Sequence, residues 1–316
     1  MFRALFAIYW ILVSSTLVGC SKNPVAPSPK PGPIVFAANR TGNISGKSHL
    51  YTIEPDGSNL TQLTHDDFDY ASPRWSPDGK TIVFQGPRTI ANPDAFPLYV
   101  MDANGKNMRL LVPQGVQPAW SPEGNCIAYS KDPRCGGVCA NWDIFILDLE
   151  KKTERSLTND PDYYETVRDW SRDGRFLLLD SNNPTDNPEG DWEIYVMDTQ
   201  GNYVARLTDN DVYDVSPRWS PDGSKIAYSA FDGKDWDIFV MDADGSNKRN
   251  LSNDDNLFSS EPCWSPDGSK ILYSVSEGPR GYELNVRNIY SINLDGTGLT
   301  KLTQGNFVND DPDWRR

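Results

Sequence analysis

Carboxylate and aromatic side chains gather in six short stretches of the chain, which carry the residue types best suited to binding or catalysis. The stretches are 64–72, 112–117, 158–167, 208–216, 252–261 and 303–311. Together they hold fourteen Asp or Glu and no Lys or Arg in 53 residues. Carboxylates steer a basic partner, and aromatic rings give it contact surface. The candidate residues for binding such a basic or amide-rich partner are Asp66, Asp67, Tyr70, Asp162, Tyr163, Tyr164, Asp211, Tyr213, Asp214, Phe258, Glu261 and Asp310.

The same acids allow three other interpretations. Asp near a strand end often caps a turn through its own side chain, which is a structural role. Ca²⁺ takes carboxylate and carbonyl oxygens, so a calcium site stays open, although no stretch has EF-hand spacing. A pair of carboxylates could also catalyse glycoside hydrolysis or a lyase reaction, but the acids are too many for a pair to be chosen. We therefore assign no metal ligand, no catalytic residue and no cofactor.

Other catalytic constellations are scarce in the sequence. The chain has two histidines, His49 and His65, and neither has a partner at metal-ligand spacing. No G-x-S-x-G nucleophile elbow occurs, and no glycine-rich phosphate loop follows a strand-like segment. These observations favour a protein without catalytic activity.

The elements that must position the acidic stretches repeat along the chain. Trp219-Ser220-Pro221-Asp222-Gly223 has close copies at 75–79, 120–124, 170–174 and 264–268, and Trp314 follows 50 residues after Trp264. Each repeat contains four short apolar segments separated by Pro, Asp and Gly turns, which predicts hairpins. The second segment is apolar at successive positions, as in Ile226-Ala227-Tyr228, so both of its faces should be buried. A four-stranded unit of this period is typical of a β-propeller blade.

The ends of the chain set the number of blades. The first unit lacks its own Trp strand, and the last residues form a Trp strand with nothing after it. The sequence therefore predicts an all-β, monomeric, six-bladed β-propeller of four-stranded antiparallel blades, with its ring closed by the C-terminal strand. The predicted blades are 34–63 with 311–314, then 72–112, 117–157, 167–207, 216–251 and 261–302.

The repeat resembles that of a known family. The motifs Leu207-Thr208, Pro217-Arg218-Trp219-Ser220-Pro221-Asp222-Gly223 and Asp237-Ile238-Phe239-Val240-Met241-Asp242 are similar to the WD-like repeats of TolB-type propellers, over residues 34–314. The resemblance implies that the Trp strand is innermost and that the acidic stretches surround one mouth of the channel. The short Ser-Pro-Asp-Gly turns would lie on the opposite, plainer rim. TolB proteins carry an α/β domain before the propeller, and residues 21–33 leave no room for one.

The N-terminal segment has the features of an export signal. Arg3 precedes an apolar run, and Leu17-Val18-Gly19-Cys20 resembles the lipobox of bacterial lipoproteins, which implies a lipid on Cys20. An ordinary secretory signal is the alternative. We expect a signal peptide over 1–19, a Pro-rich linker over 20–33 on the order of 40 Å long, and a propeller over 34–316.

Cysteine and charge add two expectations. Cys135 and Cys139 lie close together and are expected to form a local disulfide in an exported protein, with zinc as the weaker alternative, whereas Cys126 and Cys263 are expected to be small buried residues. The formal net charge of −14 disfavours nucleic acid as a partner, because nucleic-acid binding needs a basic face, so we expect none.

Together these features predict a lipid-anchored, extracytoplasmic propeller, periplasmic or on the cell surface, that binds an envelope protein or peptide without catalysis. The alternatives are a carbohydrate-active lyase or hydrolase and a calcium-binding structural module.

Overall fold

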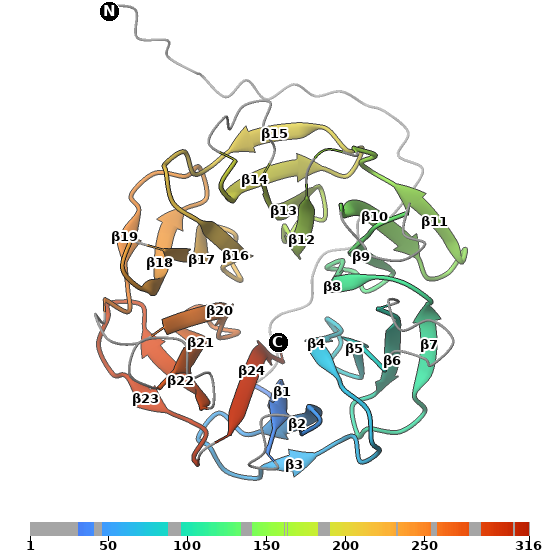
Figure 1. Cartoon of the computed structure of the whole chain (residues 1–316), viewed down its shortest axis with the longest axis vertical. Helices are drawn as coiled ribbons and strands as arrows, with labels where there is room; N and C mark the ends of the chain where they lie inside the picture. The colour runs from blue at the N-terminus through green and yellow to red at the C-terminus, as the bar shows by residue number, and fades with distance from the viewer. Residues whose placement is uncertain are drawn as a thin grey trace, which may run out of the picture.

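The computed structural model describes most of the chain beyond its N-terminal segment. The described residues are 31–40, 46–87, 96–133, 141–160, 162, 164–182, 190–231, 233–253, 258–277, 286–305 and 307–315. Across these residues the structure is all-β, as predicted, and its 24 strands form a ring of small sheets (Figure 1). No helix in the described part is long and apolar enough to cross a membrane.

Six groups of four consecutive antiparallel strands make up the ring. The first consists of β24 (Val308–Trp314), β1 (Ile34–Asn39), β2 (His49–Ile53) and β3 (Thr61–Gln62). The second and third consist of β4 (Ala71–Trp75), β5 (Thr81–Gln85), β6 (Leu98–Asp102) and β7 (Arg109–Val112), then β8 (Val116–Trp120), β9 (Cys126–Lys131), β10 (Asp143–Asp148) and β11 (Thr153–Ser156).

The other three groups follow in chain order. They consist of β12 (Glu165–Trp170), β13 (Phe176–Ser181), β14 (Glu193–Asp198) and β15 (Tyr203–Arg206), then β16 (Asp214–Trp219), β17 (Lys225–Phe231), β18 (Trp236–Asp242) and β19 (Arg249–Asn250), then β20 (Phe258–Trp264), β21 (Lys270–Ser276), β22 (Arg287–Asn293) and β23 (Thr300–Lys301).

Hydrogen bonding defines four separate four-stranded sheets and one sheet of eight strands. The eight-stranded sheet joins the sixth group to the first through one parallel bridge between Arg287 and Val308. Apart from this bridge, each half has the same strand order as the other four blades. The ring therefore contains six blades, and the propeller architecture predicted from the repeat is confirmed.

The C-terminal strand closes the ring. β24 pairs antiparallel with β1, from Ile34 opposite Trp314 to Asn39 opposite Val308. The Trp314 indole N–H also donates to the Gly32 carbonyl at 3.0 Å. The predicted completion of the first blade by the last strand is therefore confirmed.

The Trp-Ser-Pro-Asp-Gly motif forms a tight hairpin turn because each polar residue satisfies a turn amide or hydroxyl. In the fifth blade, the Ser220 hydroxyl donates to Asp222 at 2.6 Å, and the Gly223 amide donates to the Ser220 carbonyl at 2.8 Å. Gly223 has φ +76°, a left-handed conformation that glycine adopts without steric cost.

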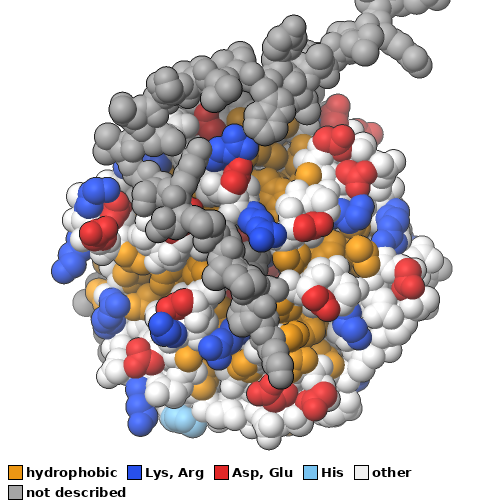
Figure 2. Space-filling view, turned by 180° about the vertical axis from the view of Figure 1, so that it is seen from behind, with side chains coloured by type: hydrophobic (Ala, Val, Ile, Leu, Met, Phe, Trp, Pro, Cys, Tyr) orange, Lys and Arg blue, Asp and Glu red, His pale blue; other side chains and the backbone are white. Residues whose placement is uncertain are grey.

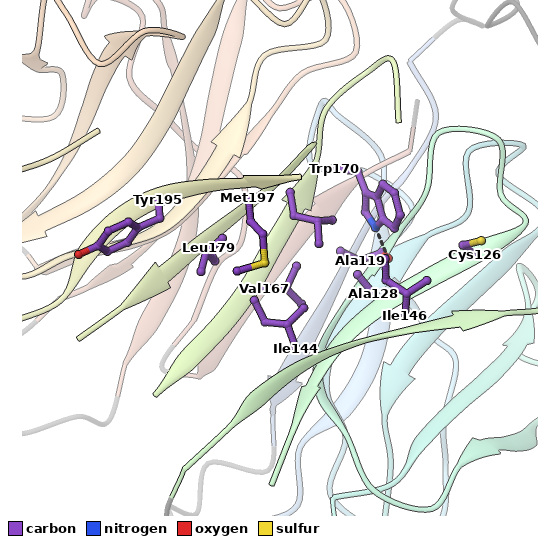
Figure 3. Packing of buried hydrophobic residues seen from close by; sticks show 11 residues of the cluster. Ala119, Cys126, Ala128, Ile144, Ile146, Val167, Trp170, Leu179, Tyr195 and Met197 are labelled. Carbon is purple, nitrogen blue, oxygen red and sulfur yellow. Dashed lines mark hydrogen bonds between the residues drawn. The ribbon is translucent and has the colours of Figure 1, made fainter. Parts of the chain in front are cut away.

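The core lies between neighbouring blades. Figure 3 shows the cluster between the third and fourth blades, where Trp170 packs beside Ala119 and Val167. The Trp170 indole N–H donates to the Ala119 carbonyl at 3.1 Å, and Trp120 and Trp264 make the equivalent bond to the blade before them. Each inner-strand tryptophan of this kind fixes one blade against the previous one.

The cysteines differ from expectation at one position. Cys263 is a buried free thiol, as predicted. Cys126 is buried but disulfide-bonded, with a partner outside the described residues, so the prediction of a simple buried side chain was wrong. Cys20, Cys135 and Cys139, the signal segment 1–19 and most of the linker lie outside the described residues, so their lipidation, pairing and boundaries stay predictions.

Candidate functional site

The propeller has two different rims. Each inner strand begins at the rim formed by the acidic stretches and the loops between second and third strands, which we call the loop rim. It ends at the rim formed by the Trp-Ser-Pro-Asp-Gly hairpins, which we call the turn rim. In the fifth blade, Asp214 begins β16 at the loop rim and Trp219 ends it at the turn rim.

Several predicted acids serve the structure of the loop rim. Asp66 accepts a hydrogen bond from the Tyr70 hydroxyl at 2.6 Å, and Tyr70 itself is only 1% exposed. Asp214 is buried and accepts from the Asn210 amide at 2.7 Å, and Asp310 pairs with the Arg287 guanidinium. In these three residues the carboxylate holds a neighbouring side chain, which is a structural role but not the turn capping that the sequence suggested.

Other predicted residues are accessible at the loop rim. Asp67, Asp162 and Asp211 are exposed, and Tyr213 is 46% exposed. Tyr164 and Phe258 are half-buried, and Tyr163 lies outside the described residues. The accessible members thus cluster on the links into the second, fourth, fifth and sixth blades.

An aromatic arc on the loop rim escaped the sequence prediction in part. It consists of Trp142, Tyr164, Trp192, Tyr213 and Trp236, on the third, fourth and fifth blades. The ring centroids of Trp142 and Tyr164 lie 6.3 Å apart, those of Tyr164 and Trp192 6.0 Å, and those of Tyr213 and Trp236 6.4 Å. The sequence does contain a pattern that marks these three tryptophans. Each is followed directly by an acid, and Trp142, Trp192 and Trp236 lie 28, 27 and 28 residues before the inner-strand Trp of the next blade.

Three arginines of the inner strands occupy the channel and balance its acids. Arg168 pairs with buried Asp180 at 2.8 Å and lies 3.9 Å from Glu261. Burial opposes ionisation of Glu261, but Arg168, Arg74 and Arg218 outweigh it and lower its pKa. Glu261 is therefore neighboured by three arginines, which the prediction of an acidic mouth did not include.

Charge is also mixed on the outer surface. Figure 2 shows acidic and basic side chains interspersed around hydrophobic ones over one face of the ring. Despite the net charge of −14, acidic side chains therefore do not cover that face uniformly.

The inner strands carry a repeated backbone irregularity. In five blades the residue three positions before the inner-strand Trp has a left-handed φ between +48° and +56°. These residues are Ser72, Gln117, Ser216, Glu261 and Asp311. The fourth blade has Val167 there with ordinary φ and a smaller register shift. That blade also has Arg168 at the position where the other five blades have a proline.

Two buried acids at blade junctions are predisposed to hold a proton. Burial raises the pKa of Glu165 to about 7, and nearby Asp143 and Asp160 add to the effect, while Tyr203 donates to its carboxylate. Burial likewise raises the pKa of Asp214 to about 7, with Glu193 nearby. Both lie at junctions of the fourth blade with its neighbours.

The turn rim holds a cavity where the sequence predicted a plain surface. Its volume is about 480 Å³, within the range of small-ligand sites. The walls include Trp75, Trp120, Trp170, Trp264 and Trp314 with several prolines, and the charged lining includes Arg74, Asp169, Arg218 and Asp313. In the sequence, the cavity arginines could have been found from the Pro-Arg-Trp order that two of the repeats share. Among the described residues, no group of three or more His, Cys, Asp or Glu is placed to hold a metal ion.

The repeat, the inner Trp strands and the closure of the ring by the last strand define a propeller of the TolB type. The profile of the TolB beta propeller domain family matches residues 114–316, and the chain belongs to that family.

Known proteins similar to this chain differ in their names. It is 28% identical over 190 residues to the uncharacterized peptidase YuxL of Bacillus subtilis, covering 58% of this chain and 25% of that protein. The structure is similar to TolB from Acinetobacter baumannii, with a TM-score of 0.73, 21% identity, and 90% and 66% of the two chains covered. It is also similar to an oligogalacturonate lyase in complex with manganese, with a TM-score of 0.51, 19% identity, and coverage of 87% and 73%. The chain spans between 25% and 66% of the length of three curated relatives, and the likeness to the solved structures is one of fold.

Proposed function

We propose that this chain is an exported, lipid-anchored propeller that binds a basic envelope protein or peptide through its loop rim, without catalysis. The aromatic arc carries this proposal. Its three tryptophans and two tyrosines lie on three consecutive blades, and Tyr213 is 46% exposed. Aromatic side chains are the residues that most often anchor protein interfaces.

The charges beside the arc favour a basic partner. Asp162 and Asp211 are exposed, and the Asp209 side chain is 85% exposed. The nearby cation Arg206 is already paired, at 3.1 Å to Glu193 and 3.1 Å to Asp209. Lysine or arginine of a partner would meet both carboxylates and aromatic faces, which attract cations.

Export and anchoring rest on the sequence. The apolar segment before Cys20 and the Leu17-Val18-Gly19-Cys20 motif support cleavage and lipidation. Cys20→Ser should leave the protein without its lipid and release it from the membrane fraction, and intact-mass measurement reads the modification directly. Equal mass and equal membrane association of both forms would overturn the anchor.

The binding proposal is tested by capture in intact cells. Cross-linking followed by mass spectrometry should identify a basic protein trapped on the loop rim. Asp162→Lys with Asp211→Lys should weaken its capture and reduce the salt dependence of what remains, because exposed charges act through screened attraction. Glu150→Lys, an exposed acid on the turn rim, is the matched control and should leave capture unchanged. Equal capture by the double variant and wild type at both low and high salt would refute the proposal.

A carbohydrate-active lyase or hydrolase is the second candidate. The fold likeness to an oligogalacturonate lyase favours it. Incubation of the purified protein with oligogalacturonate, in the presence and absence of Mn²⁺, should yield unsaturated products from a lyase, or shorter saturated products from a hydrolase. The absence of product under both conditions supports the binding function.

A further inference from the structure

We propose that the cavity on the turn rim is a second binding site, for an organic carboxylate with an apolar body. The site lies on the rim opposite the aromatic arc, so it is independent of the proposed function. It is built from the inner-strand ends of the six blades and the hairpins of five of them, which surround one hollow of about 480 Å³.

Two arginines give the cavity its anion preference. Arg74 is only 5% exposed, its Nη1 donates to the Pro73 carbonyl at 2.8 Å, and its Nε has no hydrogen-bond partner. Arg218 donates to the Arg168 carbonyl. Among the described residues, no carboxylate lies within ion-pair distance of either guanidinium. Arg74 is buried and Arg218 is half-buried, and Glu261 attracts both guanidinium groups without a direct ion pair to either. N–H donors of cations that lack a direct acceptor favour the uptake of an anion.

The carboxylates beside these arginines are already occupied. Asp313 accepts from the Trp75 amide at 2.7 Å. Asp169 accepts from the amides of Trp170 and Trp219, each at 2.9 Å. These acids offset part of the positive charge, but their oxygens hold one blade to the next. They therefore leave the guanidinium N–H groups to a ligand.

A second buried hydrogen-bond donor without a partner lies next to the Arg74 Nε. The Trp75 indole N–H is buried without a partner, whereas the indoles of Trp120 and Trp264 donate to inner-strand carbonyls. Arg74 and Trp75 are adjacent in β4 and both line the cavity. A carboxylate has two oxygens, each able to accept more than one hydrogen bond, which suits guanidinium groups beside a further N–H donor.

The walls select the rest of the ligand. Five tryptophans line the cavity together with Pro77, Pro122, Pro221 and Pro266. These side chains are rigid and apolar, so a flat or aliphatic body would lose little entropy on binding. The predicted ligand is thus a carboxylate attached to an apolar group, either as a small molecule or as the C-terminus of a peptide.

The test uses the full-length protein and two pairs of probes. The small-molecule pair is 3-phenylpropionate and 3-phenylpropionamide, and the peptide pair is Ala-Ala-Phe with a free C-terminus and the same peptide amidated. Quenching of tryptophan fluorescence, checked by calorimetry, should show at least one acid binding about tenfold or more tightly than its amide, as expected for a charge-assisted hydrogen bond. The pair that shows the difference identifies the source of the carboxylate.

Variants locate the binding. Arg218→Gln should lose the preference for the acid over the amide, Arg218→Lys should recover part of it, and Arg109→Gln, an exposed control, should change nothing. Thermal melting confirms that each variant is folded, and Arg74→Gln replaces Arg218→Gln if the latter fails to fold. Equal affinity for acid and amide in both pairs, no binding of any probe, or full preference retained in a folded Arg→Gln variant would overturn the proposal.

Discussion

Trp314 provides the sharpest test of how the ring is closed. It ends β24, packs in the cluster that contains Ile34 and Phe36, and is 7% exposed. The substitution Trp314→Ala removes this packing and the bond to the Gly32 carbonyl. Trp219→Ala is the matched control, because Trp219 is also 7% exposed and ends the inner strand of a blade within the continuous chain.

The expected loss can be worked from the contacts. A buried Trp→Ala change costs about 3–5 kcal/mol, and the indole hydrogen bond contributes about 1 kcal/mol. A domain of this size loses roughly 2 °C in melting temperature for each kcal/mol. We therefore expect Trp314→Ala to lower the melting temperature by roughly 8–12 °C, and Trp219→Ala to lower it by a similar amount.

Hydrogen exchange separates the two variants. In Trp314→Ala, amide exchange should accelerate selectively in β1 and β24, because no hairpin turn joins these two strands. In Trp219→Ala, these strands should keep their protection relative to the rest of the ring. An unchanged melting temperature for Trp314→Ala would refute the contribution of the closing strand to stability. Equal amide exchange in β1 for both variants would contradict the expectation that the pairing of β24 with β1 opens more easily than the other strand pairs.

Three further predictions concern single side chains. Glu165→Gln should raise the free energy of unfolding at pH 8 by on the order of 3 kcal/mol and have little effect at pH 4. The pKa of Glu165 is about 7 in the folded protein and near 4.3 in the unfolded chain, so the wild type loses stability as the pH rises between these values. Thermal melts at both pH values test this, and a pH-independent effect contradicts it. Arg168→Leu should cost about 3–5 kcal/mol in urea unfolding, because it leaves buried carboxylates unpaired, and a neutral result would contradict that pairing. Gly223→Ala should cost about 1 kcal/mol of stability, because alanine is strained at the left-handed φ of this position. Gly201→Ala should cost more, because the added Cβ would lie 2.4 Å from the Leu157 carbonyl oxygen. Equal melting temperatures for the two variants would contradict this.

The propeller could be predicted because its information is local and repeated. The Ser-Pro-Asp-Gly turn fixes each hairpin through bonds within five residues, such as that from the Lys225 amide to the Ser220 hydroxyl. The unpaired Trp strand at the end of the chain completes the count of blades. Both features are visible in the order of residues without knowledge of the ring.

The candidate site could be predicted only in part. The acidic stretches identified the loop rim, but composition did not distinguish exposed Asp211 from Asp214, which is buried against Asn210. Arg74 and Arg218 are part of the repeat motif itself. They line the same cavity only because inner strands from different blades converge on one axis. The cavity of the turn rim depends on the same convergence, so no single repeat reveals it.

The order of the strands has a consequence for synthesis and export. The Trp314 indole and the Gly32 carbonyl that it binds are 282 positions apart in the chain. Until the last residues emerge, β1 lacks its inner neighbour and presents an open edge bearing Ile34 and Phe36, and such edges recruit other chains. A variant that lacks residues 308–314 would leave this edge open and is expected to aggregate more readily than the full chain. Pairing of β24 with β1 in this way couples closure of the ring to solubility.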